Sequence, residues 1–217
     1  MRSREIEKYK QSLKLTTDQR ELLIGLLLGD AHLETANSGR TYRLKIEHSK
    51  SQERYVNWIY SQLKEWVRTG PQKKEKHLNG KVSENVWFQT YSHPAFKFYA
   101  QQFYQENRKK VPKLISRWLT PKAMGVWFMD DGSYKSKEHR ALILNTQGFA
   151  RSDILLLQNA LERIHSVKTQ IRKQKDGMQI LIVEPNASRF ASIIRPYLRE
   201  ELTYKLGKIG LTQLPKE

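Results

Sequence analysis

The chain has 217 residues, with 39 Lys and Arg against 22 Asp and Glu, and it contains no cysteine. The net charge of +17 opposes compaction by self-repulsion, so a polyanionic partner such as nucleic acid explains it better than a small-molecule substrate does. The lack of cysteine excludes disulfides, thiolate metal sites and cysteine nucleophiles. No apolar run approaches the roughly 18 residues of a membrane span, and the N-terminus lacks the apolar stretch of a secretory signal. We therefore expect an intracellular protein that binds nucleic acid and has no membrane partner.

Two apolar segments with helix-start signals predict two short, buried helices. The first is TTDQRELLIGLLLGD, residues 16–30, and the second is LTPKAMGVWFMDDG, residues 119–132. Thr16 and Gln19 have the spacing of a capping box, in which each side chain bonds the other's backbone N–H. Thr120 is a good N-cap for the second helix. Both helices are apolar on most sides, which is typical of burial.

Both helices carry a glycine in the middle and an acidic residue at the end. Gly25 and Gly125 would let another backbone approach closely, because they have no Cβ. Asp30 follows the first helix, and Asp131 ends the second. If the helices packed through their glycines, the two acids would meet at one end.

The elements after each apolar helix are also parallel, which predicts an internal duplication. Each half continues with a strand, a helix, a hairpin turn and a last helix. In the first half these are 41–48, 51–67, Asn79-Gly80 and 94–110, and in the second they are 139–147, 152–164, Asp176-Gly177 and 188–205. Both dipeptides suit a type I′ turn. We expect an α+β protein of two αββαββα repeats, 1–107 and 119–217, joined by a linker over 108–118.

The acids at the helix ends suggest a metal-dependent hydrolase. Two carboxylates at close range repel each other, and a divalent cation between them removes the conflict. Hard oxygen ligands without clustered histidines favour Mg²⁺, for which Mn²⁺ is a plausible substitute. Such a site can activate water and stabilise the leaving oxygen of a phosphodiester. The six histidines show no metal-ligand spacing, so His48 and His93 are expected to be structural or surface residues.

The stretches LLIGLLLGDAHLE and MGVWFMDDGS resemble the two signature helices of the LAGLIDADG homing endonucleases. The chain is similar to the single-chain, two-motif branch of this family from about residue 8 to about residue 210. The resemblance implies two saddle-shaped antiparallel sheets over the DNA major groove, with the signature helices packed at the interface. It also implies a monomer that makes a double-strand break with 3′ overhangs in a long asymmetric DNA target.

The resemblance further implies roles for individual residues. The metal ligands would be Asp30 and Asp131, with backbone contributions at Gly29 and Asp130. A lysine near each active site would assist catalysis: Lys205 in the second half, and Lys109 or Lys110 in the first. The positions that order water around the metals are matched by Glu47 and Asn145, and Gln147 is a further candidate; each could equally contact DNA from a strand face.

Basic residues on the predicted strands form the expected DNA-binding surface. Alternate side chains on a strand share one face, and such residues either read guanine edges or neutralise phosphates. The candidates are Arg40, Arg43, Lys45, Lys73, Lys74, Lys76, Lys81, Lys135, Lys137, Arg140, Arg172, Lys173 and Lys175.

Two alternatives to a DNA endonuclease remain at this stage. One is an RNA maturase of the same fold that assists group I intron splicing, and the other is a basic DNA-binding regulator, which would leave the paired acids unexplained. The resemblance implies an intron-encoded protein of an organelle, mitochondrion or chloroplast, or of a microbial cytoplasm.

Overall fold

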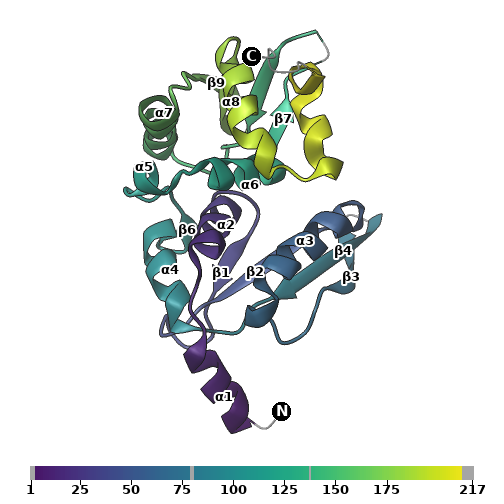
Figure 1. The fold of residues 1–217 in the computed structure, drawn as a ribbon, viewed down its shortest axis with the longest axis vertical. Coiled ribbons are helices and arrows are strands. Elements are labelled where there is room, and N and C mark those ends of the chain that lie inside the picture. The colour runs from purple at the N-terminus through teal and green to yellow at the C-terminus, as the bar shows by residue number, and fades with distance from the viewer. Residues whose placement is uncertain (1–2, 79–80, 137, 212–217) are drawn as a thin grey trace. The chain divides into compact units, whose positions relative to one another are not determined.

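A computed structural model describes residues 3–78, 81–136 and 138–211 (Figure 1). The chain divides into two compact units, and it passes between them more than once. The first unit contains the chain up to Arg20 together with Asp30–Gln101, and the second contains Glu21–Gly29 together with the chain from Gln102 onward. Within the described ranges, no helix is long and apolar enough to cross a membrane.

A four-stranded antiparallel sheet forms the centre of the first unit. Its strand order is β1-β2-β4-β3, with bounds β1 His32–Glu34, β2 Arg43–Ser49, β3 Gln72–Leu78 and β4 Lys81–Gln89. Helix α3 packs on β2 and β4. The helices are α1 Ser3–Ser12, α3 Glu53–Leu63 and α4 Lys97–Phe103, which runs on into the second unit.

The second unit contains a sheet of the same topology, which confirms two four-stranded antiparallel sheets in an α+β fold. Its strand order is β7-β8-β10-β9, with bounds β7 Gly132–Tyr134, β8 Ala141–Leu144, β9 Gln170–Gln174 and β10 Gly177–Val183. The helices are α5 Ile115–Trp118, α6 Pro121–Asp131, α7 Arg151–His165 and α8 Asn186–Ile194, followed by 3₁₀ turns at Arg195–Tyr197 and over Glu200–Leu211. A short hairpin joins β5 Tyr104–Gln105 to β6 Arg108–Lys109.

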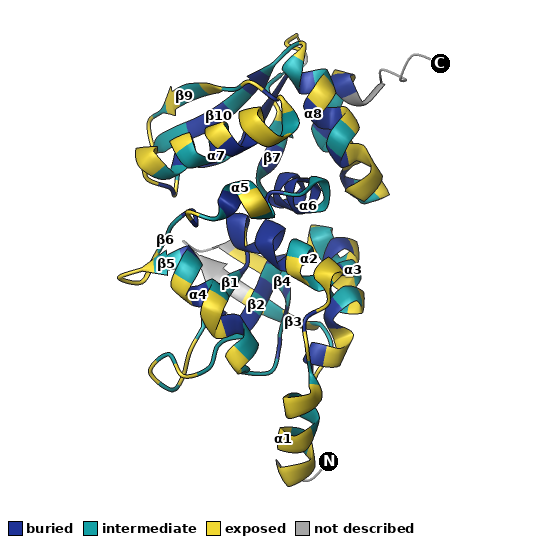
Figure 2. Ribbon diagram, turned by 60° about the vertical axis from the view of Figure 1, so that its left-hand side comes forward, coloured by how far each residue is buried: buried dark blue, intermediate teal, exposed yellow. Residues whose placement is uncertain are grey.

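The caps predicted for the two apolar helices are present. At the start of α2 (Thr17–Leu28), the Thr16 hydroxyl accepts from the Gln19 backbone N–H at 3.1 Å, and the Gln19 side chain accepts from the Thr16 N–H at 3.2 Å. Thr120 accepts from the Ala123 N–H at 3.2 Å and so caps α6. Helix α6 is buried on all sides from Ala123 to Asp130, as the dark blue ribbon shows (Figure 2).

Strand β2 has the alternation that its sequence predicts. Leu44 and Ile46 are fully buried, whereas Arg43, Lys45 and Glu47 lie on the opposite, partly exposed face. We call this second side of the first sheet the outer face. Strand β8 differs, since all four of its residues are buried.

The two helices predicted to end the repeats are shorter than expected. Helix α4 stops at Phe103, and the residues after it form the β5–β6 hairpin, whose turn residues Glu106 and Asn107 both have positive φ. In the second half, Pro196 has no N–H for a helical bond and the chain tightens into 3₁₀ turns after Ile194. Lys109 therefore lies on a strand and Lys205 in a 3₁₀ segment.

The second hairpin exists, but its turn differs from the prediction. Gln174 pairs with Gly177, so the turn residues are Lys175 and Asp176 rather than Asp176 and Gly177. Neither has the positive φ of a type I′ turn, and Gly177 itself has φ +142°. The Asn79-Gly80 turn and Lys137 lie outside the described residues, as do the side chains of Lys76 and Lys81.

Candidate active site and nucleic-acid interface

The C-terminal part of α2 packs against α6 through glycine. A Cβ on Gly25 would lie 2.6 Å from the Ala123 carbonyl oxygen and 2.6 Å from the Val126 Cβ. Four residues further on, a Cβ on Gly29 would overlap the side chain of Asp130. Residues four apart share one face of a helix, so these two contacts define a single line along which the backbones approach.

Gly125, which the sequence predicts in the same helix contact, faces other residues. A Cβ on Gly125 would lie 2.9 Å from the Tyr197 Cβ and 3.4 Å from the Ile194 carbonyl oxygen. The prediction that both glycines form the contact between the two helices is therefore wrong for the second helix.

The contacts also relate the two halves residue by residue. The differences 126 − 25 and 130 − 29 are both 101, and the same offset joins Asp30 to Asp131. Asp131 is the last residue of α6, and Asp30 follows the turn after α2. Gly29 and Asp130 therefore occupy equivalent positions, each one residue before the acid expected to bind metal.

Lys109 reaches the end of α2 from strand β6. Its Nζ donates to the carbonyl oxygen of Gly29 at 2.6 Å. Lys110, the alternative considered from the sequence, points elsewhere, and its Nζ lies 3.5 Å from Oε1 of Gln105. The geometry thus separates two neighbouring lysines that the sequence alone leaves undecided.

Lys205 occupies the equivalent place in the second half. Its Nζ donates to the carbonyl oxygens of Met129, at 2.5 Å, and Asp130, at 2.9 Å. Because Asp130 is the counterpart of Gly29, each lysine binds the carbonyl group immediately before an expected metal ligand. Two positive charges are in this way held at equivalent points of the repeat.

A cavity of about 190 Å³ in the second unit brings several of these groups together. Its lining includes the Gly29 backbone, Lys109, Asp131 and Asn145, with Leu28, Gly148 and Phe149 completing it. The backbone N–H of Asn145 donates to the carbonyl oxygen of Asp131 at 2.9 Å. The cavity therefore combines a carboxylate, an amide and an ammonium group from segments far apart in the sequence.

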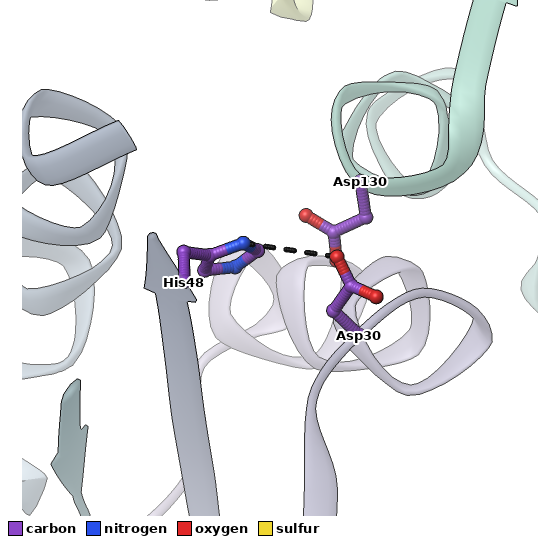
Figure 3. Close-up of side chains that lie close together, drawn as sticks. All are labelled: Asp30, His48 and Asp130. Atoms are coloured by element: carbon purple, nitrogen blue, oxygen red, sulfur yellow. Dashed lines mark ion pairs between the residues drawn. The ribbon is translucent and has the colours of Figure 1, made fainter. Parts of the chain in front are cut away.

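In the first unit, Asp30 lies beside a histidine. Nδ1 of His48, on β2, is 3.7 Å from Oδ2 of Asp30 (Figure 3). The His48 side chain is 3% exposed and that of Asp30 is 52% exposed. His48 packs edge-on against Tyr55. The sequence suggests a structural or surface histidine, and the structure places it in the core within reach of an expected ligand.

The three residues expected to order water have different surroundings. Glu47 accepts from Lys74 at 2.6 Å and from Asn85 at 2.8 Å. Burial would raise the pKa of Glu47, but these hydrogen bonds and the lysine charge outweigh it and lower the pKa below its ordinary value. Asn145 lines the cavity and accepts from Gln179 at 2.7 Å. Gln147 is placed by its backbone, which packs against Gly177.

The donor set fits a divalent cation of the magnesium type. Asp131, which offers a carboxylate, and Gly29, which offers a carbonyl oxygen, line the same cavity, and hard oxygen donors suit Mg²⁺ and Mn²⁺. Lys109 donates to the same carbonyl group, so it would lie directly beside the ion and beside a phosphate bound to it.

The basic residues of the first unit do not all lie on one face. Lys45 and Lys74 are on the outer face, each with Nζ 5.9 Å from the centre of the Trp87 ring. Lys73 alternates to the opposite face and pairs with Glu53 of α3 at 3.3 Å. Arg40 lies in the loop between β1 and β2 and donates to the Asn37 carbonyl oxygen.

The basic residues of the second unit lie mainly around its hairpin and sheet edge. Arg172 is opposite Gln179 on the neighbouring strand, and Lys173 is opposite Met178. Arg140 pairs with Glu184 at 2.9 Å. Lys175 is in the hairpin turn and Lys135 directly follows β7.

Sequence reasoning missed acidic and aromatic members of the outer face. Glu34 and Trp87 belong to it, together with Gln72 and Gln89, as the strand register shows. The sequence HLE after Asp30 has the same period of two as RLKIE, and this pattern could have identified Glu34. Gln179 could not be found in this way, because its importance depends on which strand lies beside β8.

The chain is similar to known DNA endonucleases over most of its length. The LAGLIDADG DNA endonuclease family profile matches residues 20–190. DNA endonuclease I-ChuI of Chlamydomonas applanata is 28% identical over 211 residues, which cover 90% of this chain and 97% of that protein. Probable intron-encoded endonuclease 1 of Wickerhamomyces canadensis is 31% identical, with coverage of 91% and 87%.

A solved structure is similar over nearly the whole chain. It is that of the homing endonuclease I-WcaI bound to its DNA recognition sequence, with a TM-score of 0.88 and 26% identity. The match covers 94% of this chain and 92% of that one.

Proposed function

Because the chain belongs to the LAGLIDADG DNA endonuclease family, we propose that it makes a double-strand break at one long, asymmetric DNA site, with 3′ overhangs, and acts as a monomer. The observation that carries this proposal is the duplicated lysine contact. Lys109 binds the carbonyl group of Gly29 and Lys205 binds that of Asp130. One protein chain thereby holds two equivalent sets of catalytic groups, one for each DNA strand.

The proposed metal ligands are Asp30 and Asp131, with the carbonyl groups of Gly29 and Asp130. A divalent cation bound there supplies Lewis-acid activation of water and stabilises the leaving oxygen. The lysines supply fixed positive charge beside the scissile phosphate, where negative charge develops in the transition state. Asn145 holds Asp131 through its backbone and offers an amide to ordered water in the cavity. Hydrolysis adds water across one P–O bond of each strand.

The excess of basic residues supports a DNA substrate. Cations on the sheet faces would neutralise backbone phosphates, so binding should weaken steeply with salt. Two similar but unequal halves suit an asymmetric target, because each half meets its own part of the sequence. We propose that the gene lies in an intron of an organelle or microbial genome, because a relative of this chain is described as intron-encoded.

The test is cleavage selection from a library of randomised duplexes, with Mg²⁺, with Mn²⁺ and with EDTA. We expect breaks at one sequence that require the metal and leave 3′ overhangs. Asp30→Asn and Asp131→Asn should each abolish double-strand cleavage but keep DNA binding. Specific binding to intron RNA without any DNA cleavage would instead support the RNA maturase alternative, and full activity in either variant would disprove the ligand assignment.

A further inference from the structure

Glu34 gathers two cationic side chains and a histidine on the outer face of the first sheet. Its Oε2 accepts from Nε of Arg43 at 3.2 Å and from Nη2 at 3.0 Å. Its Oε1 lies 3.0 Å from Nε2 of His32 and 3.4 Å from Nζ of Lys45. The Glu34 side chain is 29% exposed, so the cluster lies at the surface but not fully in solvent.

The side chains of this cluster are positioned by the pairing of two strands. Glu34 is directly opposite Arg43, and His32 is directly opposite Lys45, in the antiparallel register of β1 and β2. Directly opposed side chains share a face and lie close together. The guanidinium has five N–H donors in a rigid fork, and Glu34 uses two of them. Three donors of Arg43, on Nη1 and Nη2, are left for a ligand.

The Glu34 carboxylate compensates part of the charge of Arg43. Burial alone would raise the pKa of Glu34, but hydrogen bonds from His32 and Arg43 and the charge of Lys45 lower it below the ordinary value. Glu34 is therefore ionised at neutral pH, and its carboxylate repels a phosphate approaching Arg43. A neutral hydrogen-bond acceptor does not meet this repulsion.

Arg43 also forms part of a recess on the outer face. The cavity, of about 340 Å³, lies in the first unit, where β2 begins. Its polar lining includes Arg68, Gln72 and Gln89, and Trp87 also lines it. Amide groups and a guanidinium fork are the side-chain groups that pair with base edges in the major groove.

From this geometry we infer that Arg43 reads a guanine in the DNA target, and that Glu34 is the positioning residue that orients it. The Nη1 and Nη2 donors of Arg43 would bond O6 and N7 of the base, while Glu34 holds the adjacent edge formed by Nε and Nη2. The inference rests on the proposed function, since it names the base contact that one half of the enzyme makes.

Arg43→Lys and Glu34→Gln test the inference by binding rather than cleavage. Wild-type and variant proteins are incubated with randomised duplexes in EDTA, and the bound sequences are read. We expect the wild type to select guanine at one position, and both variants to lose about 5- to 150-fold of that preference. The base preferences at the other positions of the DNA site should remain as in the wild type. Glu34→Gln should also bind all duplexes more tightly, because it removes a negative charge.

Glu84→Gln is the matched control. Glu84 lies on strand β4 of the same sheet and pairs with Lys50 at 2.8 Å. Its side chain is on the face opposite the outer face, so the selected sequence should not change. Two results together would overturn the inference. Arg43→Lys would select the same sequence as the wild type, and Arg43→Ala would reduce the slope of log affinity against log salt by the amount expected for about one lost phosphate contact. A wild type that selects no sequence contradicts the proposed function itself. Melting curves confirm that each variant is folded.

Discussion

Nζ of Lys109 lies 2.6 Å from the carbonyl oxygen of Gly29, and both groups line the cavity that also contains Asp131. The lysine comes from the hairpin before the second repeat, the carbonyl group from the first signature helix, and the carboxylate from the second. One of the two proposed catalytic sets thus combines groups from three distant segments of the chain. This arrangement determines which strand each residue should affect.

Lys109→Met should therefore slow cleavage of the same DNA strand as Asp131→Asn. We expect a loss of about 100- to 1,000-fold in the cleavage rate of that strand, the range typical of removing one transition-state charge partner. Lys205→Met should affect the opposite strand. The measurement is single-turnover cleavage of a duplex labelled differently on each strand. Lys110→Met is the matched control, and an equal loss in that variant would remove the assignment to Lys109.

Gly25→Ala should destabilise the protein. Alanine favours a helix over glycine by about 1 kcal/mol, but the added Cβ would meet the backbone oxygen of Ala123, which cannot move aside. Overpacking of this kind costs about 1–3 kcal/mol, so the clash should exceed the propensity gain. Urea denaturation measures the difference in unfolding free energy. Gly148→Ala is the control, because a Cβ at Gly148 meets nothing within 4 Å. This variant should be as stable as the wild type.

Thr16→Ala should remove the cap of α2. The reciprocal bonds between Thr16 and Gln19 satisfy two backbone N–H groups, and losing such a cap costs about 1 kcal/mol. Thr17 is exposed and begins the helix, so Thr17→Ala should stay within about 0.5 kcal/mol of wild type. Thermal melts of the two variants make the comparison, and similar melting temperatures would argue against the cap's contribution.

Stability should fall as the pH drops through the ordinary pKa of histidine, and His93 should contribute to this. Its Nδ1 accepts from the Ala95 N–H at 3.0 Å, and its Nε2 lies 2.9 Å from the Lys10 carbonyl oxygen, which suits the neutral ring. Burial lowers the pKa of His93 below 6.5. The unfolded chain thus binds the proton more readily, so acid favours unfolding, by at most about 1.4 kcal/mol per pH unit.

Unfolding free energies of wild type and His93→Gln between pH 5 and 8 test this contribution. The variant should be less stable at pH 8, and its deficit should shrink toward pH 5. Thr17→Ala, which changes an exposed residue without a titratable side chain, should keep the wild-type pH dependence. A constant difference between wild type and His93→Gln would show that His93 does not titrate on unfolding.

Local sequence signals predicted the parts of the fold that local interactions determine. The caps at Thr16 and Thr120 and the alternation along β2 depend on neighbouring residues, and all are present. The sequence predicts a helix over 94–110, yet the chain turns at Glu106 and Asn107 into the β5–β6 hairpin. Asn107 is the one residue there whose type favours positive φ.

The candidate site was predicted less completely, for a different reason. Asp30, Asp131 and Lys205 stand beside recognisable motifs, so the sequence alone is enough to propose them. The choice between Lys109 and Lys110 depended on the strand that replaced the expected helix, because adjacent residues on a strand point to opposite sides. The pairing of Glu34 with Arg43 depends on the length of the loop from residue 35 to 42, which sets the register and has no sequence signature.

The passage of the chain between the units limits how such a protein can evolve by exchange of halves. Residues 21–29 belong to the second compact unit, although they are encoded ahead of the whole first sheet. A gene break after the first repeat would separate the Gly25 face of α2 from Ala123 and Val126. A hybrid of two parent proteins would fold only if its α6 packed against that glycine face. Exchange of whole halves between related genes should therefore be rarer than substitution of the residues that face DNA.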